Sequence, residues 1–456
     1  MYPARSHLLP ILTAITLGLS SRSAQALSFD KLNQISQATT VQLMGERSGS
    51  GVIIGRYRDS YLVLTSKHVV GVEDRYKAIT TDGQDHPIES KTIQPIADTD
   101  LALLQFKSKR NYSVARLASY TPQPQQYLFL SGFPAPNEAV AERIRLFTPG
   151  KVVSSASAIA VSADPMSQGY RLFYSNLAEA GMSGGAVFDS DGRVVGIHGR
   201  SDGEEVEDRI MGKQRRLRLG ISAGIPIRVL TKLRPDLQLP AERQIARTPT
   251  LEEKQSFDRR INQMVITPAG VSSVVTWANY GNALYRQDRY PEALKALNQA
   301  LEMDFRFAQV WYAQGTVLAA MDRHQEALNA FDRAIQLQPK FYRAWKSKSL
   351  SLMALKQGTE ARQAVEEALN LEPRSAVAWY LRGLAQTEDH SFALEALDQS
   401  IALEPEFTDA WVLRGEVLQK LGRSEEAAAS VGQALTIDPD SVAAKALKQQ
   451  LEKLTP

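Results

Sequence analysis

Two different hydrophobic patterns divide the chain near residue 273. Between about 36 and 235, short apolar runs such as 50–55, 61–65 and 101–106 are separated by turn segments rich in Asp, Ser and Gly. Many short apolar runs punctuated by such turns are typical of an all-β barrel or sandwich. The pattern therefore predicts an all-β domain in the first half of the chain.

After residue 273 the pattern repeats about every 34 residues. All five tryptophans lie there, at positions 277, 311, 345, 379 and 411, and glycine or serine stands four positions after each of them. Alanine follows at a nearly constant spacing, and prolines close the repeats after the first one. Small residues let two helices approach closely, and proline ends the second helix. The pattern resembles the tetratricopeptide repeat.

Together the two patterns predict a multidomain protein, an all-β domain followed by an all-α solenoid. The expected parts are a signal peptide at 1–26, the all-β domain at 27–235, a linker with one helix at 236–272, and five repeats plus a capping helix at 273–456.

The N-terminus has the features of a secretory signal. Arg5 precedes the apolar run 8–19, and Ala24-Gln25-Ala26 offers small residues for cleavage. The apolar run has about twelve residues, fewer than the ~20 of a membrane-spanning helix. We therefore expect export to the periplasm or the exterior, with an uncleaved membrane anchor as the alternative.

Composition excludes several classes of chemistry. The chain has no cysteine, so it has no disulfide, no thiolate nucleophile and no cysteine-bound zinc. The formal net charge of +3 gives no basic surface for nucleic acid. No metal-ligand cluster or phosphate-binding loop stands out, so we expect no metal and no cofactor.

A serine lies in the glycine-rich segment Gly181-Met182-Ser183-Gly184-Gly185. A serine hydroxyl reacts at neutral pH only when a base removes its proton, and the resulting tetrahedral oxygen needs backbone N–H donors. The glycine two positions before the serine permits a sharp turn, so the N–H groups of Gly181 and Ser183 are expected to form an oxyanion hole. The alternative interpretation is a turn ahead of the strand 186–188.

Two other residues complete the set that acyl transfer requires. His68 follows an apolar strand and is the expected general base, whereas His86 lies in a polar stretch and is expected to be solvated. Asp100 begins another strand and is expected to accept the second N–H of the histidine, with Asp98 as the alternative. The order His68, Asp100, Ser183 is that of chymotrypsin-type enzymes.

The segments around these residues resemble trypsin-like peptidases, and most of all the bacterial high-temperature-requirement proteases. These segments are 48–54, 65–70, 100–104 and 181–185. The late strand 220–226 resembles the same group, and Ala223 on it is expected to line the substrate site. The resemblance implies two six-stranded barrels with His68, Asp100 and Ser183 as the catalytic triad between them. The chain departs from that group in carrying tetratricopeptide repeats where peptide-binding PDZ domains usually follow.

Three residues bear on activation and specificity through this resemblance. Met182 replaces the aspartate that pairs with a freed N-terminal ammonium in the zymogens of the family, so activation by N-terminal insertion is not expected. Leu177, six positions before the serine, implies an apolar base of the first substrate pocket. His198, in Gly-Ile-His-Gly, resembles the histidine with which glutamyl endopeptidases hold an acidic side chain. The preference stays open between apolar and acidic side chains.

The predicted function is that of a secreted serine endopeptidase. Its expected partners are polypeptide substrates and a protein or peptide in the groove of the repeats, with no nucleic acid and no membrane span after signal cleavage. The alternative is a protein-binding scaffold with an inactive or conditionally active peptidase domain. An esterase with the same triad is disfavoured because the strands do not alternate with helices.

Overall fold

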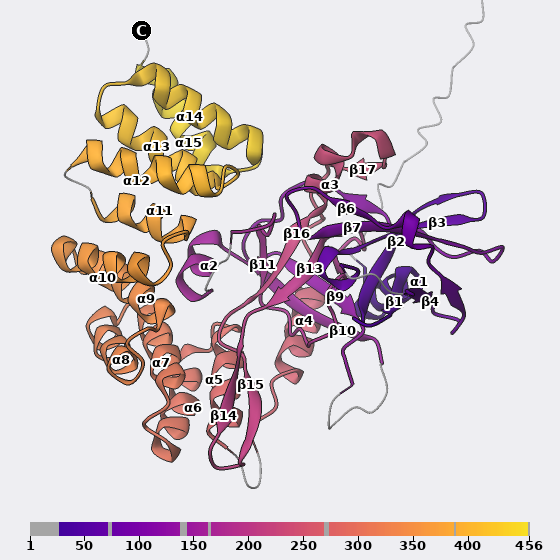
Figure 1. The fold of residues 1–456 in the computed structure, drawn as a ribbon, viewed down its shortest axis with the longest axis horizontal. Coiled ribbons are helices and arrows are strands. Elements are labelled where there is room, and N and C mark those ends of the chain that lie inside the picture. The colour runs from indigo at the N-terminus through magenta and orange to yellow at the C-terminus, as the bar shows by residue number, and fades with distance from the viewer. Residues whose placement is uncertain are drawn as a thin grey trace, which may run out of the picture.

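The structure is a computed structural model of the chain. It describes residues 27–71, 75–136, 144–162, 166–268, 273–386 and 389–454. The predicted signal peptide lies outside the described residues. Figure 1 shows a β-rich part and an arc of helices whose inner side faces it. We call the described residues from 27 to 268 the β-rich domain.

The N-terminal sheet of the β-rich domain has seven strands in the order β5-β4-β1-β2-β3-β7-β6. They are β1 (Thr40–Met44), β2 (Gly49–Tyr57), β3 (Ser60–Ser66), β4 (Lys77–Ile79), β5 (Asp85–Pro87), β6 (Gln94–Ile96) and β7 (Leu101–Lys107). A single bridge between Ile88 and Phe106 joins the end of β5 to β7. Six strands therefore curl into a barrel, and β6 lies outside the ring.

β3 shows why these strands are apolar on both faces. Side chains alternate across a strand, so Tyr61 and Val63 face the interior of the first barrel, whereas Leu64 belongs to a larger core cluster shared with the second barrel. All three residues are fully buried. Both faces of β3 are therefore buried, one in the barrel interior and the other in the shared core, which explains the short continuous apolar runs in the sequence.

The second sheet has the order β12-β9-β10-β11-β16-β13-β8-β17, and β12 also pairs with β13. Its strands are β8 (Leu117–Ala118), β9 (Tyr127–Gly132), β10 (Leu146–Val153), β11 (Leu172–Tyr174), β12 (Ala186–Phe188), β13 (Val194–Ser201), β16 (Ser222–Pro226) and β17 (Ala241–Glu242). The extra pairing closes a ring of six strands. Between β13 and β16 the chain leaves the ring as a two-stranded hairpin, β14 (Glu204–Asp208) and β15 (Lys213–Leu217).

Short helices complete the β-rich domain. They are α1 (Phe29–Thr39), α2 (Ser155–Val161), α3 (Ile227–Leu233) and α4 (Leu251–Gln263), with 3₁₀ turns η1 (Lys67–Val69), η2 (Ser90–Thr92) and η3 (Pro235–Leu237). α4 lies in the predicted linker and begins with a capping box between Thr250 and Glu253. Its Phe257 is fully buried, 4.9 Å from the ring of Phe129. The linker helix therefore packs on the second barrel.

The C-terminal half consists of paired helices. They are α5 (Val274–Tyr285), α6 (Tyr290–Met303), α7 (Ala308–Ala320), α8 (His324–Leu337), α9 (Tyr342–Ala354), α10 (Gly358–Leu371), α11 (Ala376–Ala385), α12 (His390–Leu403), α13 (Thr408–Lys420), α14 (Ser424–Ile437) and the last helix, α15 (Val442–Leu454). Gly315 of α7 shows why small residues recur, since a Cβ there would lie 2.6 Å from the ring of Phe331 on α8. Trp345 and Trp379 each donate their indole N–H to the carbonyl six positions earlier, which ties each repeat to the preceding turn.

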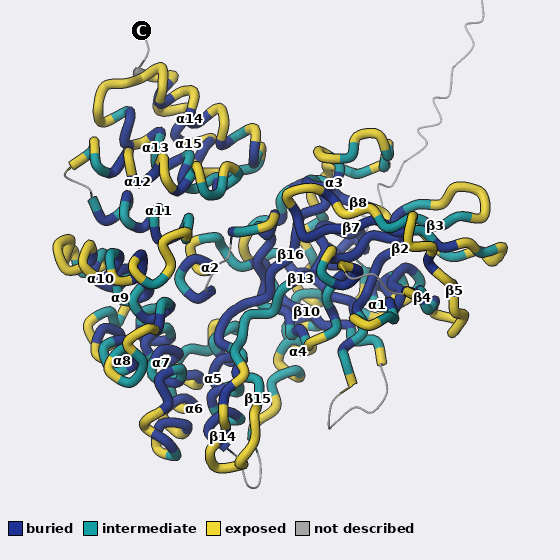
Figure 2. The backbone as a smooth tube through the Cα atoms, in the orientation of Figure 1, coloured by how far each residue is buried: buried dark blue, intermediate teal, exposed yellow. Residues whose placement is uncertain are grey.

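Burial follows this architecture. Buried residues line the barrel strands and the facing sides of paired helices, whereas exposed residues gather at hairpin tips and outer turns (Figure 2). The predicted fold class, an all-β double barrel followed by an all-α repeat solenoid, is confirmed. Within the described ranges, no helix is both long and apolar enough to cross a membrane.

The expected solvation of His86 is wrong. This residue is only 8% exposed, because its position on β5 stacks the imidazole on Phe106 at 4.7 Å. Its Nε2 lies 3.0 Å from the Tyr112 hydroxyl and 3.2 Å from that of Thr80. The polar neighbours in the sequence are exposed, but His86 itself is a structural histidine of the first barrel.

Candidate active site

Strand pairing brings His68 and Asp100 together. Ser66 at the end of β3 pairs with Leu101 at the start of β7, so the residues just beyond these ends meet at one edge of the sheet. One Asp100 oxygen accepts the backbone N–H of His68 at 2.9 Å, and the other lies 2.6 Å from His68 Nδ1. The Asp100 side chain is 9% exposed and that of His68 is 42% exposed. The carboxylate thus fixes the imidazole ring, which stays partly exposed.

A tyrosine that the sequence analysis missed completes the environment of the aspartate. The Tyr170 hydroxyl donates to Asp100 Oδ2, the oxygen that also contacts His68. Burial alone would raise the pKa of the Asp100 carboxyl, but the hydrogen bonds from His68 and Tyr170 outweigh it and hold the pKa below its ordinary value. Burial and the nearby Asp100 charge raise the pKa of Tyr170, so its hydroxyl keeps the proton that it donates.

Two residues of β13 hold Tyr170 in this position. A Cβ at Gly199 would overlap the Tyr170 hydroxyl, so only glycine leaves room for it. The guanidinium of Arg200 lies over the Tyr170 ring at 4.4 Å and donates to Gln168 at 2.9 Å. Both residues directly follow His198, but the sequence shows only a short glycine-containing strand and gives no sign that they adjoin a tyrosine 30 residues earlier.

The serine loop has the backbone geometry of an anion-binding turn. Gly181 and Gly184 have φ of +90° and +83°, in the left-handed region that favours glycine. The Gly184 N–H donates to the His198 carbonyl at 2.7 Å, and the Ser183 carbonyl accepts from Ser50 at 2.8 Å, which fixes the loop between the barrels. By contrast, the N–H groups of Gly181 and Ser183 have no acceptor within the described residues. They are the two donors expected for an oxyanion hole.

The Ser183 hydroxyl itself points to the Gly199 carbonyl, at 3.4 Å. In the described part of the chain it makes no hydrogen bond to His68. The structure therefore brings His68 and Asp100 into direct contact and places Ser183 on a preformed loop beside them. The Ser183 hydroxyl would have to leave the Gly199 carbonyl before it could bond to His68.

Met182 holds the serine loop by packing. Its side chain is fully buried in a core cluster beside Leu130. The Met182 N–H donates to the Glu179 carbonyl at 3.1 Å, and its sulfur accepts from the Glu179 N–H at 3.4 Å. An apolar anchor thus occupies the position at which the resemblance implied a charge pair in zymogens.

Comparison with known families follows the same division as the fold. A profile described as a trypsin-like peptidase domain matches residues 49–197. Profiles of tetratricopeptide repeats match residues 279–340, 312–370 and 384–451. The chain carries a trypsin-like peptidase domain followed by tetratricopeptide repeats. The predicted fusion is confirmed, and the β-rich domain is called the peptidase domain from here on.

Two of the similar solved structures each cover a little over a third of the chain. One is titled "MamA RS-1 ArsTM double mutant", with 24% identity, 36% of this chain and 93% of that chain covered, and a TM-score of 0.34. Another is YrrB, titled a TPR protein with an unusual peptide-binding site. It has 22% identity and a TM-score of 0.34, and the match covers 39% of this chain and 92% of that chain. No curated protein sequence matches the chain.

The expected specificity residues lie in different environments of the peptidase domain. Leu177 is half-buried after β11, and its carbonyl accepts from Thr148 at 2.8 Å. Ala223 pairs with Phe173 on one side of β16 and with Arg200 on the other. Asp98, the alternative to Asp100, is exposed, and His68 bonds to Asp100 instead.

His198 is part of the barrel core. It is 1% exposed, and its Nδ1 lies 2.7 Å from the Tyr174 hydroxyl. Burial, helped by the nearby His68, lowers the pKa of His198 to about 3. The imidazole is therefore neutral at physiological pH and carries no positive charge for an acidic substrate side chain.

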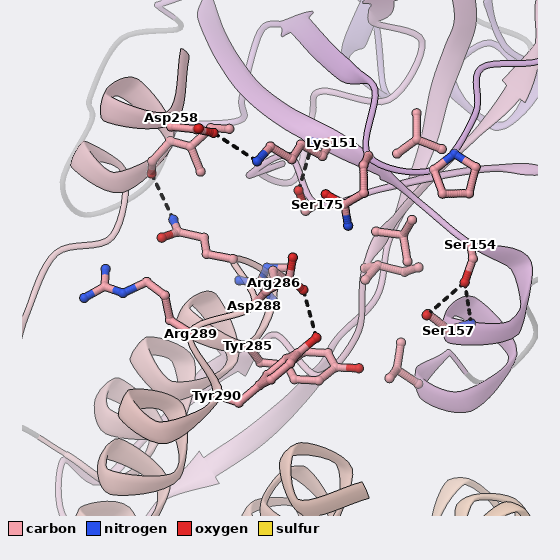
Figure 3. Close-up of a pocket in the computed structure, with 18 of the residues that line it drawn as sticks. Lys151, Ser154, Ser157, Ser175, Asp258, Tyr285, Arg286, Asp288, Arg289 and Tyr290 are labelled. Carbon is pink, nitrogen blue, oxygen red and sulfur yellow. Dashed lines mark hydrogen bonds and ion pairs between the residues drawn. The ribbon is translucent and has the colours of Figure 1, made fainter. Parts of the chain in front are cut away.

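A cavity of about 750 Å³ lies between the first repeat and the peptidase domain with its helix α4, and its lining includes none of His68, Asp100 and Ser183 (Figure 3). Its charged side chains make contacts within the protein, and Arg286 donates to the Gly220 carbonyl at 3.1 Å. Lys151 contacts Asp258 at 3.0 Å, and the Tyr290 hydroxyl donates to Asp288 at 2.8 Å. Within the described ranges, no group of three or more His, Asp or Glu side chains is arranged to hold a metal ion.

Proposed function

We propose that the chain is a serine endopeptidase with His68, Asp100 and Ser183 as its catalytic residues. One observation carries this proposal: a histidine oriented by a buried aspartate adjoins a serine loop with two backbone N–H groups that have no acceptor among the residues the structure describes. A structural histidine–aspartate pair would need neither these N–H groups nor a partly exposed imidazole.

The reaction follows from these positions. The Ser183 hydroxyl leaves the Gly199 carbonyl, gives its proton to His68 Nε2 and attacks the carbonyl carbon of the substrate. The N–H groups of Gly181 and Ser183 stabilise the negative oxygen, and Asp100 stabilises the imidazolium. His68 then protonates the leaving amine, and water releases the acyl group by the same sequence of proton transfers.

For specificity we propose an apolar side chain at the cleaved bond. Leu177 carries no charge, and the neutral, buried His198 gives an acidic side chain no cationic partner. We also propose export to the periplasm or the exterior, on the basis of the segment 1–26 alone.

The test is labelling with a fluorophosphonate probe, beside a Ser183→Ala variant, with casein digestion in parallel. The expected result is labelling and casein cleavage that both disappear in the variant, with cuts after apolar residues. Cuts after acidic residues would refute the specificity proposal. No labelling of the folded wild-type protein would refute the peptidase proposal.

A second candidate is a protein-binding scaffold whose peptidase domain is conditionally active. The contact between the Ser183 hydroxyl and the Gly199 carbonyl favours it, because a serine held there is not activated by His68. In this case labelling would require a binding partner, and adding that partner would raise the labelling rate without changing the labelled residue.

A further inference from the structure

The inner side of the repeat arc is occupied by the peptidase domain. α2 lies in the hollow of the arc, next to α9 (Figure 1). Four side chains of α7 and α9 donate to the carbonyl groups at the C-terminal end of α2. They are Tyr312 to Val161 at 2.9 Å, Arg343 to Val161 at 2.9 Å, Ser347 to Ala160 at 2.9 Å, and Lys346 to both Ile159 and Ser162.

These donors form a built site. Tyr312 and Lys346 are fully buried, and Arg343 and Ser347 are 6% and 5% exposed. The last carbonyl groups of a helix have no partner within the helix and carry partial negative charge. Cationic and hydroxyl donors therefore match the end of α2 in both hydrogen bonding and charge.

Arg343 also contacts a second segment of the peptidase domain. Its guanidinium pairs with both oxygens of Asp202, one of them at 2.7 Å, just beyond the end of β13. The Asp202 N–H donates to the Ile221 carbonyl at 3.3 Å, so Asp202 joins the two ends of the β14–β15 hairpin. One arginine of the repeats thus bridges α2 and the base of this hairpin.

The hairpin is fixed along the first repeat as well. Its Val206 and Leu217 belong to the hydrophobic core of the repeats. The Asn279 side chain accepts from the Arg218 N–H at 2.8 Å, and the Arg218 guanidinium pairs with Glu179, which contacts Met182. Contacts with the repeats therefore continue through the hairpin to the serine loop.

The two segments that the repeats contact, α2 and the base of the β14–β15 hairpin, both adjoin the proposed active site in the chain. The connection from β10 to β11 includes α2 and, after it, Gln168 and Tyr170. The Gln168 carbonyl accepts from the Asp100 N–H at 3.1 Å, and the Tyr170 hydroxyl donates to the Asp100 carboxylate. The strand β13, which ends next to Asp202, carries Gly199 beside Tyr170. The segments that the repeats hold are the segments that position Asp100 and the tyrosine.

We propose that the inner face of the repeats is an intramolecular clamp whose resident ligand is the C-terminal end of α2, and that Arg343 holds α2 and the β14–β15 hairpin in the arrangement that the active site requires. The catalytic part of this proposal rests on the proposed peptidase function. The clamp itself does not.

The test compares Arg343→Ala with Arg362→Ala in the full chain, by hydrogen exchange and by fluorophosphonate labelling. Arg362 is an exposed arginine of α10 whose guanidinium contacts Thr359 in its own helix, so it is a matched control. Loss of a buried ion pair favours local opening, so Arg343→Ala is expected to raise exchange in 155–162 and 202–221 about tenfold or more. The labelling rate is expected to fall about tenfold as well. Arg362→Ala is expected to change neither.

A second variant, Asp202→Asn, removes the ion pair from the peptidase side and leaves the repeats intact. Raised exchange in α13 and α14 would show that Arg343→Ala unfolds the repeats. In that case Asp202→Asn decides whether the repeats hold α2 and the hairpin. Unchanged exchange in both segments would overturn the clamp. Raised exchange with a wild-type labelling rate would overturn its catalytic part. An unlabelled wild-type protein would refute the peptidase function and that catalytic part, while exchange still decides the clamp.

Discussion

Removal of the Tyr170 hydroxyl tests how Asp100, the proposed catalytic aspartate, is held. In Tyr170→Phe, Asp100 loses one of its charge-assisted hydrogen bonds but keeps both bonds from His68. A hydrogen bond to a charged group contributes about 1.5–3 kcal/mol. The Asp100 carboxylate must stabilise the imidazolium in the transition state, so this loss is expected mainly in kcat.

Each 1.4 kcal/mol corresponds to about a tenfold change in rate, so we expect kcat/KM of a peptide substrate to fall roughly ten- to a hundredfold. KM is expected to change little, because the hydroxyl contacts the aspartate and not the substrate. The assay is steady-state hydrolysis of a chromogenic peptide chosen from the mapped cleavage sites, with urea unfolding in parallel.

Tyr120→Phe is the matched control. The Tyr120 hydroxyl donates to buried Asp189 at 3.2 Å, in a cluster of ion pairs around Arg193. Its loss is expected to lower stability by a comparable amount and to leave kcat/KM within about twofold of wild type. If Tyr170→Phe behaved in the same way, with stability lowered and kcat retained, the assignment of Tyr170 as a positioning residue would be wrong.

Three further outcomes are expected. The pKa of His198 is about 3 in the folded protein and 6.5 in an unfolded chain. Between pH 6.5 and pH 3 only the unfolded chain binds this proton, so the free energy of unfolding falls by roughly 1.4 kcal/mol for each unit of decreasing pH. Urea unfolding should therefore show that the free energy of unfolding lost between pH 7 and pH 4.5 is about 2–3 kcal/mol smaller in His198→Asn than in wild type. Met182→Ala removes the buried anchor of the serine loop and should lower the free energy of unfolding by about 2–5 kcal/mol and slow fluorophosphonate labelling; labelling at the wild-type rate would contradict its anchoring role. Gly315→Ala should lower the stability of the repeats by about 1–3 kcal/mol, because the added Cβ clashes with α8. Gly358→Ala should be neutral or stabilising, because no atom lies within 4 Å of its added Cβ. Equal shifts of the melting temperature in the two variants would contradict the argument that Gly315 permits the close approach of the helices.

Local patterns in the sequence determined the two halves of the fold. The alternation of short apolar runs with turns predicts strands because side-chain direction has a period of two, and the spacing of tryptophans and small residues predicts paired helices. His68, Asp100 and Ser183 could be predicted as catalytic residues for a related reason, because each lies beside a strand or in a glycine turn with its own local signal. The catalytic roles of these residues, the export of the protein and its cleavage specificity remain predictions.

Contacts between distant segments were decided only by the tertiary structure. Nothing near Tyr170 in the sequence indicates that its hydroxyl reaches Asp100, 70 residues away, or that Gly199 is the residue that leaves room for it. The pairing of Arg343 with Asp202 spans 141 residues and depends on how the repeats dock on the barrels. A sequence pattern records which face of an element is apolar, but not which partner covers it, because that choice depends on the packing of the whole chain.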